Sequence, residues 1–499
     1  MDAPTTIGLD LGTSALKAVL VDADQRVLAT AEVPLGTQRP KPLWSEQHPD
    51  AWWDATLAAL ATLRAQAPEA YAATRAIGLS GQMHGAVLLD DADRPIRPAI
   101  LWNDGRAHEE AAALAREHPH LAAIVGVKPM PGLTAPKLAW LAAHEPEAFA
   151  RIRTLLLPKD VIRLHLTGEH ATDMSDAAGT WLLDQARRDW CDAALDAVAL
   201  ERTRLPRLVE GTKTAGTVRP ALAAELGLPE GVIVAGGGGD VAAGAVGIGA
   251  VGEGDAFVSL GTSAQIFVAS AAYRAAPEAL VHAFCHCVPQ RWFAMAAMLN
   301  GASVIAWAAR LLGLSVADAL ALAERETTAP GRVLFLPYLA GERTPHDDPY
   351  ATGVLVGLSH DTSPADIVRA VLDGLVLSLV DGRDALASAG VSIETAGLIG
   401  GGARSPYLAS LLASALGTPL VRHRGAETGP AFGAARLAAC AATGDPIAAV
   451  ATPPPVLDVT PPDPALRDAY AAQLPRWRAL YRALREEFRR SHLSRPSGS

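Results

Sequence analysis

Short apolar runs alternate along the chain with longer segments that are rich in alanine and leucine. The apolar runs are 7–10, 15–21, 231–235, 256–259, 264–269, 333–336 and 396–399. The longer segments include 51–66, 107–117 and 365–389. Short apolar runs are typical of buried strands, and long Ala/Leu-rich windows are typical of helices. Their mixture predicts an α/β fold.

The turn between the first two strands occurs a second time, about half the chain later. The letters "LGTS" begin at Leu11, between two strand-like runs, and again at Leu260 in the same setting. Internal repetition of this kind predicts two similar domains. We place them at 1–247 and 248–451, with the boundary in the Gly/Ala-rich stretch between Asp240 and Asp255.

The C-terminal segment 452–499 is expected to differ from both domains. Residues 452–465 read "TPPPVLDVTPPDPA", and this density of proline predicts a linker without regular structure. A final helix is expected over about 466–489, packing on the body. Its basic run, 476–490, is interpreted as a solvated helix face.

Composition and charge narrow the classes of function. Half of the 499 residues are hydrophobic, which favours folded cores over disorder, and the net charge of −10 argues against a nucleic-acid partner. The four cysteines are too few for a disulfide framework. Because "HAFCHC" at 282–287 has no second knuckle to complete a zinc site, we interpret it as part of an apolar strand. The chain has no signal-like start and no apolar run of spanning length, so we expect a cytoplasmic protein without a membrane partner.

The two Gly-Thr-Ser turns are candidates for binding phosphate. Backbone amides and hydroxyls at such turns can hold anionic oxygens, so Thr13, Ser14, Gly261 and Thr262 are candidate contacts, and Lys17 can add a cation. The alternative is an ordinary hairpin at each place. An acid, Asp10, precedes only the first turn; Ser259 stands at the matching place in the second.

Three glycine-rich stretches are further candidates. "GGGGD" follows a strand and ends at Asp240, which is placed to act either as a general base or as a helix N-cap. "GGGARS", from 400, is a candidate loop for nucleotide approach. The small-residue segment 429–439 resembles the segment after Asp240, and we expect the two to meet at the domain junction. The chain contains no GxxxxGK[ST] motif, and its loose GxGxxA stands too late for a dinucleotide site.

Polar and aromatic residues gather in two stretches of the first half. "GQMHGA" contributes Gln82 and His84, and "LWNDGR" contributes Trp102, Asn103 and Asp104. A polyol site needs hydrogen-bond partners for each hydroxyl and an aromatic face for the C–H groups. For His84 alone a structural role is the alternative, but the two stretches together favour a sugar site.

These motifs together resemble the FGGY family of carbohydrate kinases, within the actin-like, ribonuclease-H-like ATPase fold. The resemblance extends over about residues 1–440 and is greatest to bacterial members that act on D-xylulose. It is carried by "GLDLGTS", "PLWSEQHPDAWW", "GQMHGA", "RPAILWNDGR", "TAPKLAWL", "LLPKD", "TDMSDAAGTWLLD", "SLGTSA", "FLPYLAGERTPH", "GVLVGLSHDTSPADIVRAVLDG", "GGGARS" and "GPAFGAARLA". It implies two similar actin-like domains with a cleft between them, the first binding sugar and the second ATP.

The resemblance also implies roles for individual residues. Asp240 matches the catalytic base and a magnesium contact, and Asp10 the acid that holds magnesium. Met83 and His84 match the pair that contacts the ketose, with Trp102, Asn103 and Asp104 also at the sugar. The expected ATP contacts are Thr13, Ser14, Lys17, Gly261, Thr262, Gly401 and Gly402. One departure is Val241, which stands where a polar residue is usual, beside one extra glycine.

The implied reaction is ATP- and Mg²⁺-dependent phosphorylation of D-xylulose or a similar ketose. Alternatives within the family are kinases of ribulose, gluconate or glycerol. An actin-like ATPase without a sugar substrate would explain both turns but would not need the polar cluster at 82–84 and 102–104. A sugar-sensing regulator is disfavoured because no helix-turn-helix precedes the first strand. A homodimer is compatible with the resemblance.

Overall fold

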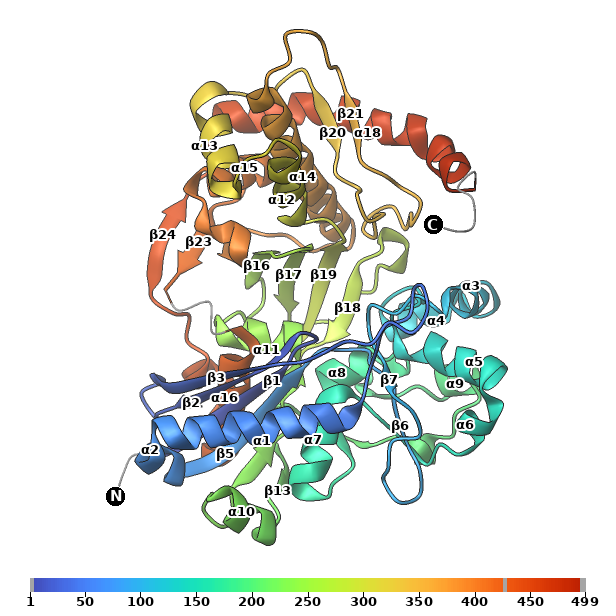
Figure 1. The fold of residues 1–499 in the computed structure, drawn as a ribbon, viewed down its shortest axis with the longest axis vertical. Helices are drawn as coiled ribbons and strands as arrows, with labels where there is room; N and C mark the ends of the chain where they lie inside the picture. Colours follow the sequence, from blue (N-terminus) through green and yellow to red (C-terminus); the bar gives the residue numbers. More distant parts are fainter. Residues whose placement is uncertain (1–3, 425–428, 494–499) are drawn as a thin grey trace.

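The strands assemble into two seven-stranded sheets, one in each of two bodies that are stacked in Figure 1. The structure is a computed structural model that describes residues 4–424 and 429–493, with side chains through residue 490. Each of the seven predicted strands is present, within two residues of its expected bounds. The chain is therefore of the α/β class, as predicted.

The sheet of the lower body has the order β13-β14-β5-β1-β2-β3, and the short β15 also pairs with β5. Strand β1 is antiparallel to β2 and parallel to β5. The strands are β1 (Thr5–Leu11), β2 (Ala15–Val21), β3 (Val27–Pro34), β5 (Thr74–Gly81), β13 (Thr214–Thr217), β14 (Ile233–Ala235) and β15 (Gly238–Gly239).

The sheet of the upper body repeats this pattern in the order β24-β23-β22-β16-β17-β19-β18. Strand β16 is antiparallel to β17 and parallel to β22, as β1 is to β2 and β5. The strands are β16 (Ala256–Leu260), β17 (Ala264–Ser270), β18 (His282–Cys285), β19 (Trp292–Met298), β22 (Ala396–Ile399), β23 (Leu420–His423) and β24 (Val456–Thr460). The repeated sequence thus corresponds to a repeated sheet topology.

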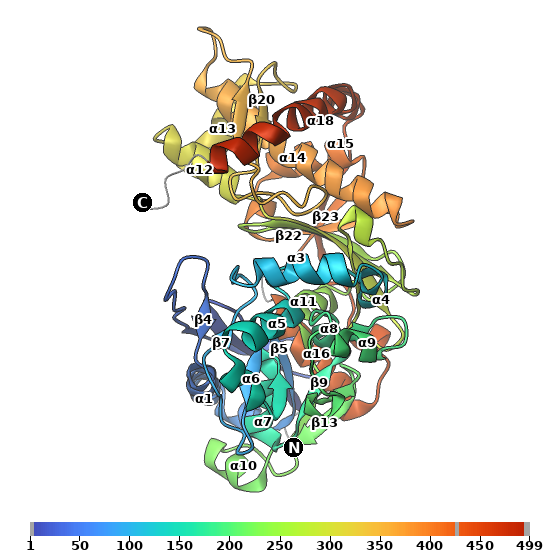
Figure 2. The ribbon, with the colours of Figure 1, turned by 90° about the vertical axis from the view of Figure 1, so that its right-hand side faces the viewer.

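Helices cover both sheets, and a group of short elements extends the lower body to the right in Figure 1 and faces the viewer in Figure 2. The first-half helices are α1 (Pro49–Gln66), α2 (Pro68–Ala72), α3 (His108–Glu117), α4 (Leu121–Val125), α5 (Thr134–His144), α6 (Pro146–Ala150), α7 (Pro158–Thr167), α8 (Met174–Ala178), α9 (Asp192–Asp196), α10 (Pro220–Leu226) and α11 (Asp240–Gly247). The second-half helices are α12 (Ser303–Leu311), α13 (Val316–Glu326), α14 (Pro364–Ser388), α15 (Pro406–Leu416), α16 (Gly429–Thr443), α17 (Ile447–Val450) and α18 (Pro464–Leu493).

Short strand pairs and 3₁₀ turns complete the described chain. The pairs are β4 (Glu46–Gln47) with β7 (Ala99–Ile100), β6 (Val87–Leu89) with β8 (Thr154–Leu156), β9 (Ala171–Asp173) with β12 (Arg207–Val209), β10 (Leu183–Asp184) with β11 (Asp189–Trp190), and β20 (Leu334–Leu336) with β21 (Val354–Val356). The 3₁₀ turns are η1 (Arg202–Arg204), η2 (Pro277–Ala279) and η3 (Gly401–Arg404).

Local sequence explains where the long helices begin. Helix α14 starts with a capping box, in which Ser363 accepts from the Asp366 amide and Asp366 accepts from the Ser363 amide. Pro364 stands at its first position, where the missing N–H costs no hydrogen bond. Helix α1 likewise starts at Pro49.

Helices α11 and α16 cross at the junction of the two bodies, which confirms that their small-residue segments meet. A Cβ built on Gly433 of α16 would lie 1.7 Å from the Ala243 carbonyl oxygen of α11. Helix α16 also lies directly on the lower sheet, because a Cβ on Gly8 of β1 would lie 1.9 Å from the Ala431 oxygen. Only glycine permits backbones to approach this closely. A helix from the second half of the chain therefore packs on the sheet of the first half.

The Pro-rich segment differs from its prediction. We expected 452–465 to lack regular structure, but residues 456–460 form β24, which pairs antiparallel with β23. The prolines stand before and after this strand, at the sheet edge, where a missing N–H is tolerated. The helix expected over 466–489 is present as α18, and residues 494–499 of the proposed C-terminal segment lie outside the described residues.

Among the described residues, no single helix is both long and apolar enough to cross a bilayer. The pair α12 and α13, bent by 86° at the break between them, meets the length and composition criteria only when the two are joined.

Candidate active site

The first Gly-Thr-Ser turn joins β1 to β2 at the face of the lower body that meets the upper one. Asp10 ends β1 and is only 8% exposed. Its carboxylate accepts a hydrogen bond of 2.9 Å from the Ser80 hydroxyl on β5. Lys17 stands opposite Asp10 on β2, so the two side chains share one face of the sheet. The turn thus carries an acid that is fixed by its neighbouring strand.

Asp240 lies close enough to Asp10 for the two carboxylates to repel each other. Burial, with a smaller contribution from repulsion by Asp10, raises the pKa of Asp240 to about 7, against the hydrogen bond from the Val241 amide. Burial likewise raises the pKa of Asp10 to about 6, against the Ser80 hydrogen bond and the Lys17 charge. Two neighbouring carboxylates that each resist ionisation are typical of a site that handles a proton or a cation.

Asp240 is the first residue of α11 rather than its N-cap. Gly239 occupies the N-cap position, and one Asp240 oxygen accepts from the Val241 amide at 2.8 Å. The alternative N-cap interpretation is therefore wrong by one residue, because glycine ends the extended strand β15 immediately before the helix. The carboxylate still lies at the helix N-terminus, where the helix dipole favours negative charge.

Thr13 is held by the residues that we assigned to the sugar. Its hydroxyl donates to Gln82 at 2.9 Å and accepts from the Trp102 indole N–H at 2.9 Å. Its carbonyl accepts from the Gln47 amide at 2.7 Å, and Gln82 donates to Gln47 at 3.0 Å. The structure therefore brings the first turn and the polar cluster together. Ser14, its neighbour, is exposed.

Met83 and His84 are fixed from behind by α8. His84 has a left-handed backbone, with φ of 69°, and its Nδ1 donates to the Gly179 carbonyl at 2.6 Å. A Cβ on Gly179 would lie 2.5 Å from that nitrogen and 2.9 Å from Met83 Cε. Burial lowers the pKa of His84 to about 3, so the ring is neutral and its Nε2 is a hydrogen-bond acceptor.

The three residues of "WND" have different surroundings. Trp102 is 41% exposed and Asn103 is exposed, so both are accessible to a ligand. The carboxylate of Asp104 is buried, bonds Arg106 at 2.7 and 2.9 Å, and accepts from the Ser45 amide at 2.6 Å. Because its oxygens are engaged in this ion pair, Asp104 presents no free carboxylate to a sugar. These contacts instead give Asp104 a structural role, holding Arg106 and the Ser45 backbone.

The second Gly-Thr-Ser turn, between β16 and β17, is supported by the start of α12. The Gly301 amide and the Ser303 hydroxyl both donate to the Thr262 carbonyl, at 2.9 and 2.7 Å. The side chain of Thr262 is exposed. Gly400 and Gly402 lie against Leu260 at the base of this turn, whereas a Cβ on Gly401 would meet nothing within 4 Å. Gly401 is therefore the glycine of this loop that is open to a ligand.

A buried charged cluster, Lys159, Asp160, Arg163, Asp173 and Asp176, lies beneath the loop that carries Asp240. Lys159 Nζ contacts the three carboxylates at 2.7, 2.9 and 3.0 Å. Burial alone would lower the pKa of Lys159, but the three carboxylates raise it above its usual value.

This charged cluster is connected to the glycine loop by hydrogen bonds. Arg163 donates to the carbonyls of Ala235 and Gly236, both at 2.6 Å. The Gly239 amide donates to the Ser175 hydroxyl at 3.0 Å, and that hydroxyl donates to Asp173 at 2.6 Å. The residue immediately before Asp240 is thus tied to buried charges.

Sequence reasoning assigned no role to several of these supporting residues. Ser80, Gln47, Ser175 and Lys159 stand inside or next to motifs that carried the family resemblance, but nothing in their spacing predicts their contacts. The signal that could have found them is the presence of polar residues in otherwise apolar, buried segments.

The residues present fit a magnesium ion. Among the described residues no group of three or more His, Cys, Asp or Glu side chains could enclose a metal. Magnesium does not require such a cage, because it binds through one or two carboxylates together with water and substrate phosphates. Asp10 and Asp240 supply two such carboxylates.

Comparison with known proteins identifies both halves. The model of the "FGGY family of carbohydrate kinases, N-terminal domain" matches residues 5–247, and that of the C-terminal domain matches residues 256–442. The chain is 47% identical to a xylulose kinase of Escherichia coli K12, over 97% of this chain and 98% of that protein. It is 48% identical to a xylulose kinase of Klebsiella pneumoniae, over 87% and 89%.

Solved structures agree in fold. A xyloylose kinase from Brucella ovis superimposes with a TM-score of 0.94 at 46% identity, covering 96% of this chain and 99% of that one. A xylulose kinase from Rhodospirillum rubrum gives 0.90 at 30%, covering 97% and 100%. A glycerol kinase from Plasmodium falciparum with ADP, at 18% identity, gives 0.88 over 97% and 98%, which shows the shared fold alone.

Proposed function

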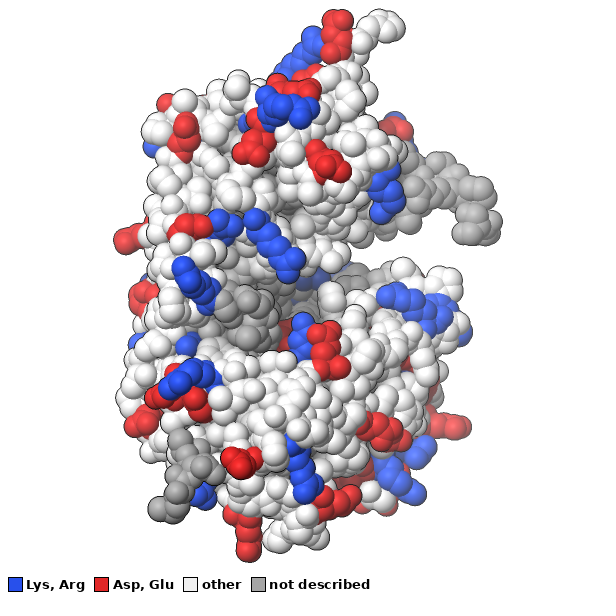
Figure 3. All heavy atoms as spheres, turned by 60° about the vertical axis from the view of Figure 1, so that its left-hand side comes forward, with Lys and Arg blue, Asp and Glu red and all other residues white. Residues whose placement is uncertain are grey.

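Because the chain belongs to the FGGY family of carbohydrate kinases, we propose that it transfers the γ-phosphoryl group of ATP to D-xylulose, giving D-xylulose 5-phosphate and ADP. The observation that carries the proposal is the pair of neighbouring carboxylates, Asp10 and Asp240, with Met83 packed against Gly239 immediately before Asp240. Figure 3 shows the hollow between the two bodies in which both substrates would meet.

Asp240 acts as the general base. It takes the proton from the terminal hydroxyl of the sugar as that oxygen forms a bond to the γ-phosphorus and the bond from phosphorus to the ADP oxygen breaks. A pKa of about 7 suits this task, because the carboxylate is ionised in a large fraction of molecules at neutral pH and still accepts a proton readily. The charged cluster beneath Gly239 keeps the base in place.

The two turns hold the nucleotide phosphates from opposite sides. Thr262 and Gly261 approach from the upper body, and Ser14, Lys17 and the Thr13 backbone from the lower one. Gly401 and Gly402 belong to the loop below the adenosine, with Gly401 as its open position. Asp10 and Asp240 would hold magnesium, which neutralises phosphate charge when bound.

The sugar is bound on the lower body. His84 Nε2 accepts from a sugar hydroxyl, because its other nitrogen already donates to Gly179. Trp102 offers an exposed ring face for sugar C–H groups, while its N–H orients Thr13. Met83 closes the apolar side of the pocket, and exposed Asn103 supplies a further polar group.

We further place the reaction in the cytoplasm. All four cysteines are buried as free thiols, as is usual in a reducing compartment where ATP is also available. The association of two copies into a homodimer stays a prediction.

A panel of sugars in a coupled assay of ADP release tests the substrate. We expect D-xylulose to give the highest kcat/KM among D-xylulose, D-ribulose, gluconate and glycerol. A higher value for any of the other three, or ATP hydrolysis that no sugar stimulates, would contradict the proposal.

The Asp240→Asn variant tests the assigned base. We expect kcat to fall by about 10²- to 10⁴-fold, because the amide cannot accept the proton, while the KM for D-xylulose changes only a few-fold. Asp91→Asn, at an exposed position on the same body, is the matched control and should behave as the wild type. Near-normal turnover by Asp240→Asn would contradict the assignment.

A further inference from the structure

One residue of the upper body, Arg343, has a guanidinium on which Glu342 and Asp347 act through their charges but to which neither is bonded. It belongs to the segment "GERTPH" (341–346), between β20 and β21. Its guanidinium is half-buried and forms neither an ion pair nor a hydrogen bond with any residue in the described ranges 4–424 and 429–490. An arginine has five donors, and their lack of partners in a partly desolvated position is costly unless a ligand supplies acceptors.

Both neighbours of Arg343 fix its backbone. The carboxylate of Glu342 is buried and accepts from the Leu299 and Arg343 amides, at 2.7 and 2.8 Å. Thr344 is buried on the other side: its hydroxyl donates to the Leu280 carbonyl at 2.9 Å, and its amide donates to the Ala297 carbonyl at 3.2 Å. The charges of Glu342 and Asp347 act on Arg343, but the Glu342 oxygens are engaged by backbone amides, so the donors of the guanidinium stay without acceptors.

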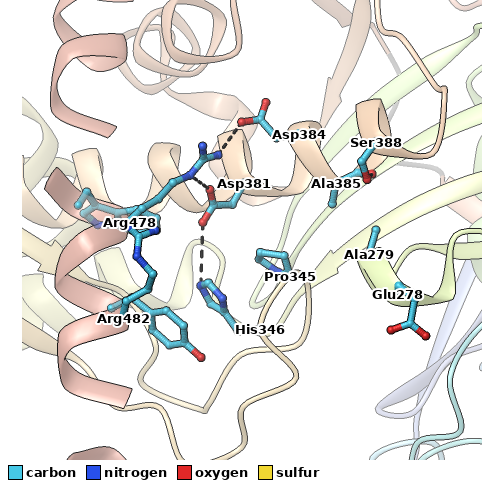
Figure 4. A pocket seen from close by; sticks show the side chains of 12 residues that line it. Glu278, Ala279, Pro345, His346, Asp381, Asp384, Ala385, Ser388, Arg478 and Arg482 are labelled. Carbon is cyan, nitrogen blue, oxygen red and sulfur yellow. Dashed lines mark hydrogen bonds and ion pairs between the residues drawn. The ribbon is translucent and has the colours of Figure 1, made fainter. Parts of the chain in front are cut away.

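The segment is also anchored from behind, as Figure 4 shows. His346 lies in a pocket between α14 and α18, where its ring stacks on Tyr481 at 3.7 Å between centroids. It bonds the Tyr338 hydroxyl at 2.9 Å, and Asp381 on the pocket wall is paired with Arg478 at 2.6 Å. A segment that is anchored on both sides presents Arg343 at little cost in conformational entropy when a ligand binds.

Arg343 acts on the histidine side of the site. Its charge helps to lower the pKa of His84 and of His282, whereas the charges that shift the pKa values of Asp10 and Asp240 are those of Lys17 and Asp10. A chain of contacts also connects the Arg343 segment to His84. Thr344 bonds Leu280, and β18 begins two residues later, at His282. Helix α8 packs against β18 and ends at Gly179, whose carbonyl accepts from His84.

His282 adds a second polar atom without a partner. The residue is 2% exposed, and its Nδ1 has no hydrogen-bond partner among the described residues. Burial lowers the pKa of His282 well below its usual value, so the ring is neutral. The donors of Arg343 thus lie close enough to the neutral rings of His84 and His282 for its charge to act on both, and His84 offers a free acceptor nitrogen.

We propose that Arg343 is a sugar-binding residue supplied by the upper body, and that its guanidinium donates to the carbonyl oxygen at the end of the ketose remote from the phosphorylated hydroxyl. A carbonyl oxygen only accepts hydrogen bonds and a guanidinium only donates them, so the two match. The adjacent sugar hydroxyl can donate to the free nitrogen of His84. A ketose bound in this way bridges the two bodies and favours their closure over the reacting atoms.

This inference rests on the proposed function, because it assigns a further contact for the same sugar. Its test compares Arg343→Met with Arg343→Lys and with Arg310→Met, a control at an exposed position on α12. For Arg343→Met we expect the KM for D-xylulose to rise by about 10- to 100-fold, as for the loss of a hydrogen bond from a charged donor. The KM for ATP should stay within about twofold, and Arg343→Lys should be intermediate because it keeps the charge but not the fork of donors.

Xylitol separates sugar recognition from a merely structural role. It is the same five-carbon chain with the carbonyl reduced to an alcohol, so it lacks the acceptor that Arg343 is proposed to bind. We expect Arg343→Met to raise the KM for D-xylulose far more than it raises the inhibition constant of xylitol as a competitive inhibitor. An unchanged KM for D-xylulose, or an equal loss for both ligands, would overturn the inference.

The outcomes distinguish the two proposals. A wild-type chain without D-xylulose kinase activity contradicts the proposed function itself. An active wild type with an Arg343→Met variant that keeps its sugar affinity contradicts only the role of Arg343. If Arg343→Met has a lowered Tm, the ratio of D-xylulose to xylitol affinity in Arg343→Lys decides, and a ratio equal to that of the wild type counts against the proposal.

Discussion

The two Gly-Thr-Ser turns have the same sequence but different surroundings. In the first, Leu11 pairs with Leu16 and four residues form the loop; in the second, Leu260 pairs with Ala264 and three residues form it. The first turn is bonded to side chains, through Gln47, Gln82 and Trp102. The second is bonded to backbone and to the start of α12.

The difference fits the proposed division between sugar and nucleotide. The hydroxyl of Thr13 is engaged by Trp102 and Gln82, the residues that we propose lie at the sugar. The second turn leaves the hydroxyl of Thr262 exposed, so it is available to a nucleotide. Repetition has thus preserved the sequence of the turn but not its loop length, and the residues around each copy determine what it contacts.

The largest expected effect is on kcat, and it separates Asp10, before the first turn, from Ser259 at the matching position before the second. Asp10→Asn should lower kcat by about 10²-fold or more, because it removes a charge that acts on Asp240 at the reacting centre. Ser259→Ala, at the matching position, should change kcat by less than about threefold. Steady-state kinetics of both variants check this. Comparable losses of kcat would show that the residues before the two turns do not have different roles.

The two threonines should differ in which substrate they affect. Thr13→Val removes the partner of Trp102 and Gln82, so we expect the KM for D-xylulose to rise by about 5- to 20-fold from loss of these hydrogen bonds. Thr262→Val should raise the KM for ATP instead, by a similar factor, with little change for the sugar. If both variants affect only ATP, Thr13 has no part in organising the sugar site.

The smallest expected effect concerns the two glycines beside the second turn. Gly402→Ala should destabilise the fold by about 1–3 kcal/mol, because its Cβ would lie 2.9 Å from Leu260 Cβ. Gly401→Ala should leave the Tm within about a degree, because its Cβ meets nothing, and should raise the KM for ATP a few-fold. Thermal unfolding and ATP kinetics separate the two; equal Tm losses would contradict this distinction.

Much of the fold could be predicted from the sequence, because period and repetition are local signals. The apolar runs gave the strands, and the repeated turn gave the two similar sheets. The strand β24 was missed, because its prolines obscure a five-residue run whose pairing depends on β23, far away in sequence. Edge strands of this kind are determined by tertiary context rather than by propensity.

The site could be predicted only in part, because some of its contacts also depend on tertiary context. Motif matching located Asp10, Asp240, Met83 and His84, and the structure brings them together. It could not predict that Arg106 engages Asp104, because this ion pair depends on how the loop folds. Nor could it predict that Arg343 and His282 approach His84 from the other half of the chain, because such contacts follow only from the docking of the two bodies.

The crossing of α11 and α16 has a consequence for how the chain can be divided. One face of the lower sheet, with Val19, Val21 and Ala76, is covered by α16, which is made from the second half of the sequence. A fragment ending at residue 247 would leave that face open to water and prone to aggregation. Two separately expressed halves should therefore be insoluble alone and regain activity only when co-expressed, as in a split-enzyme complementation pair.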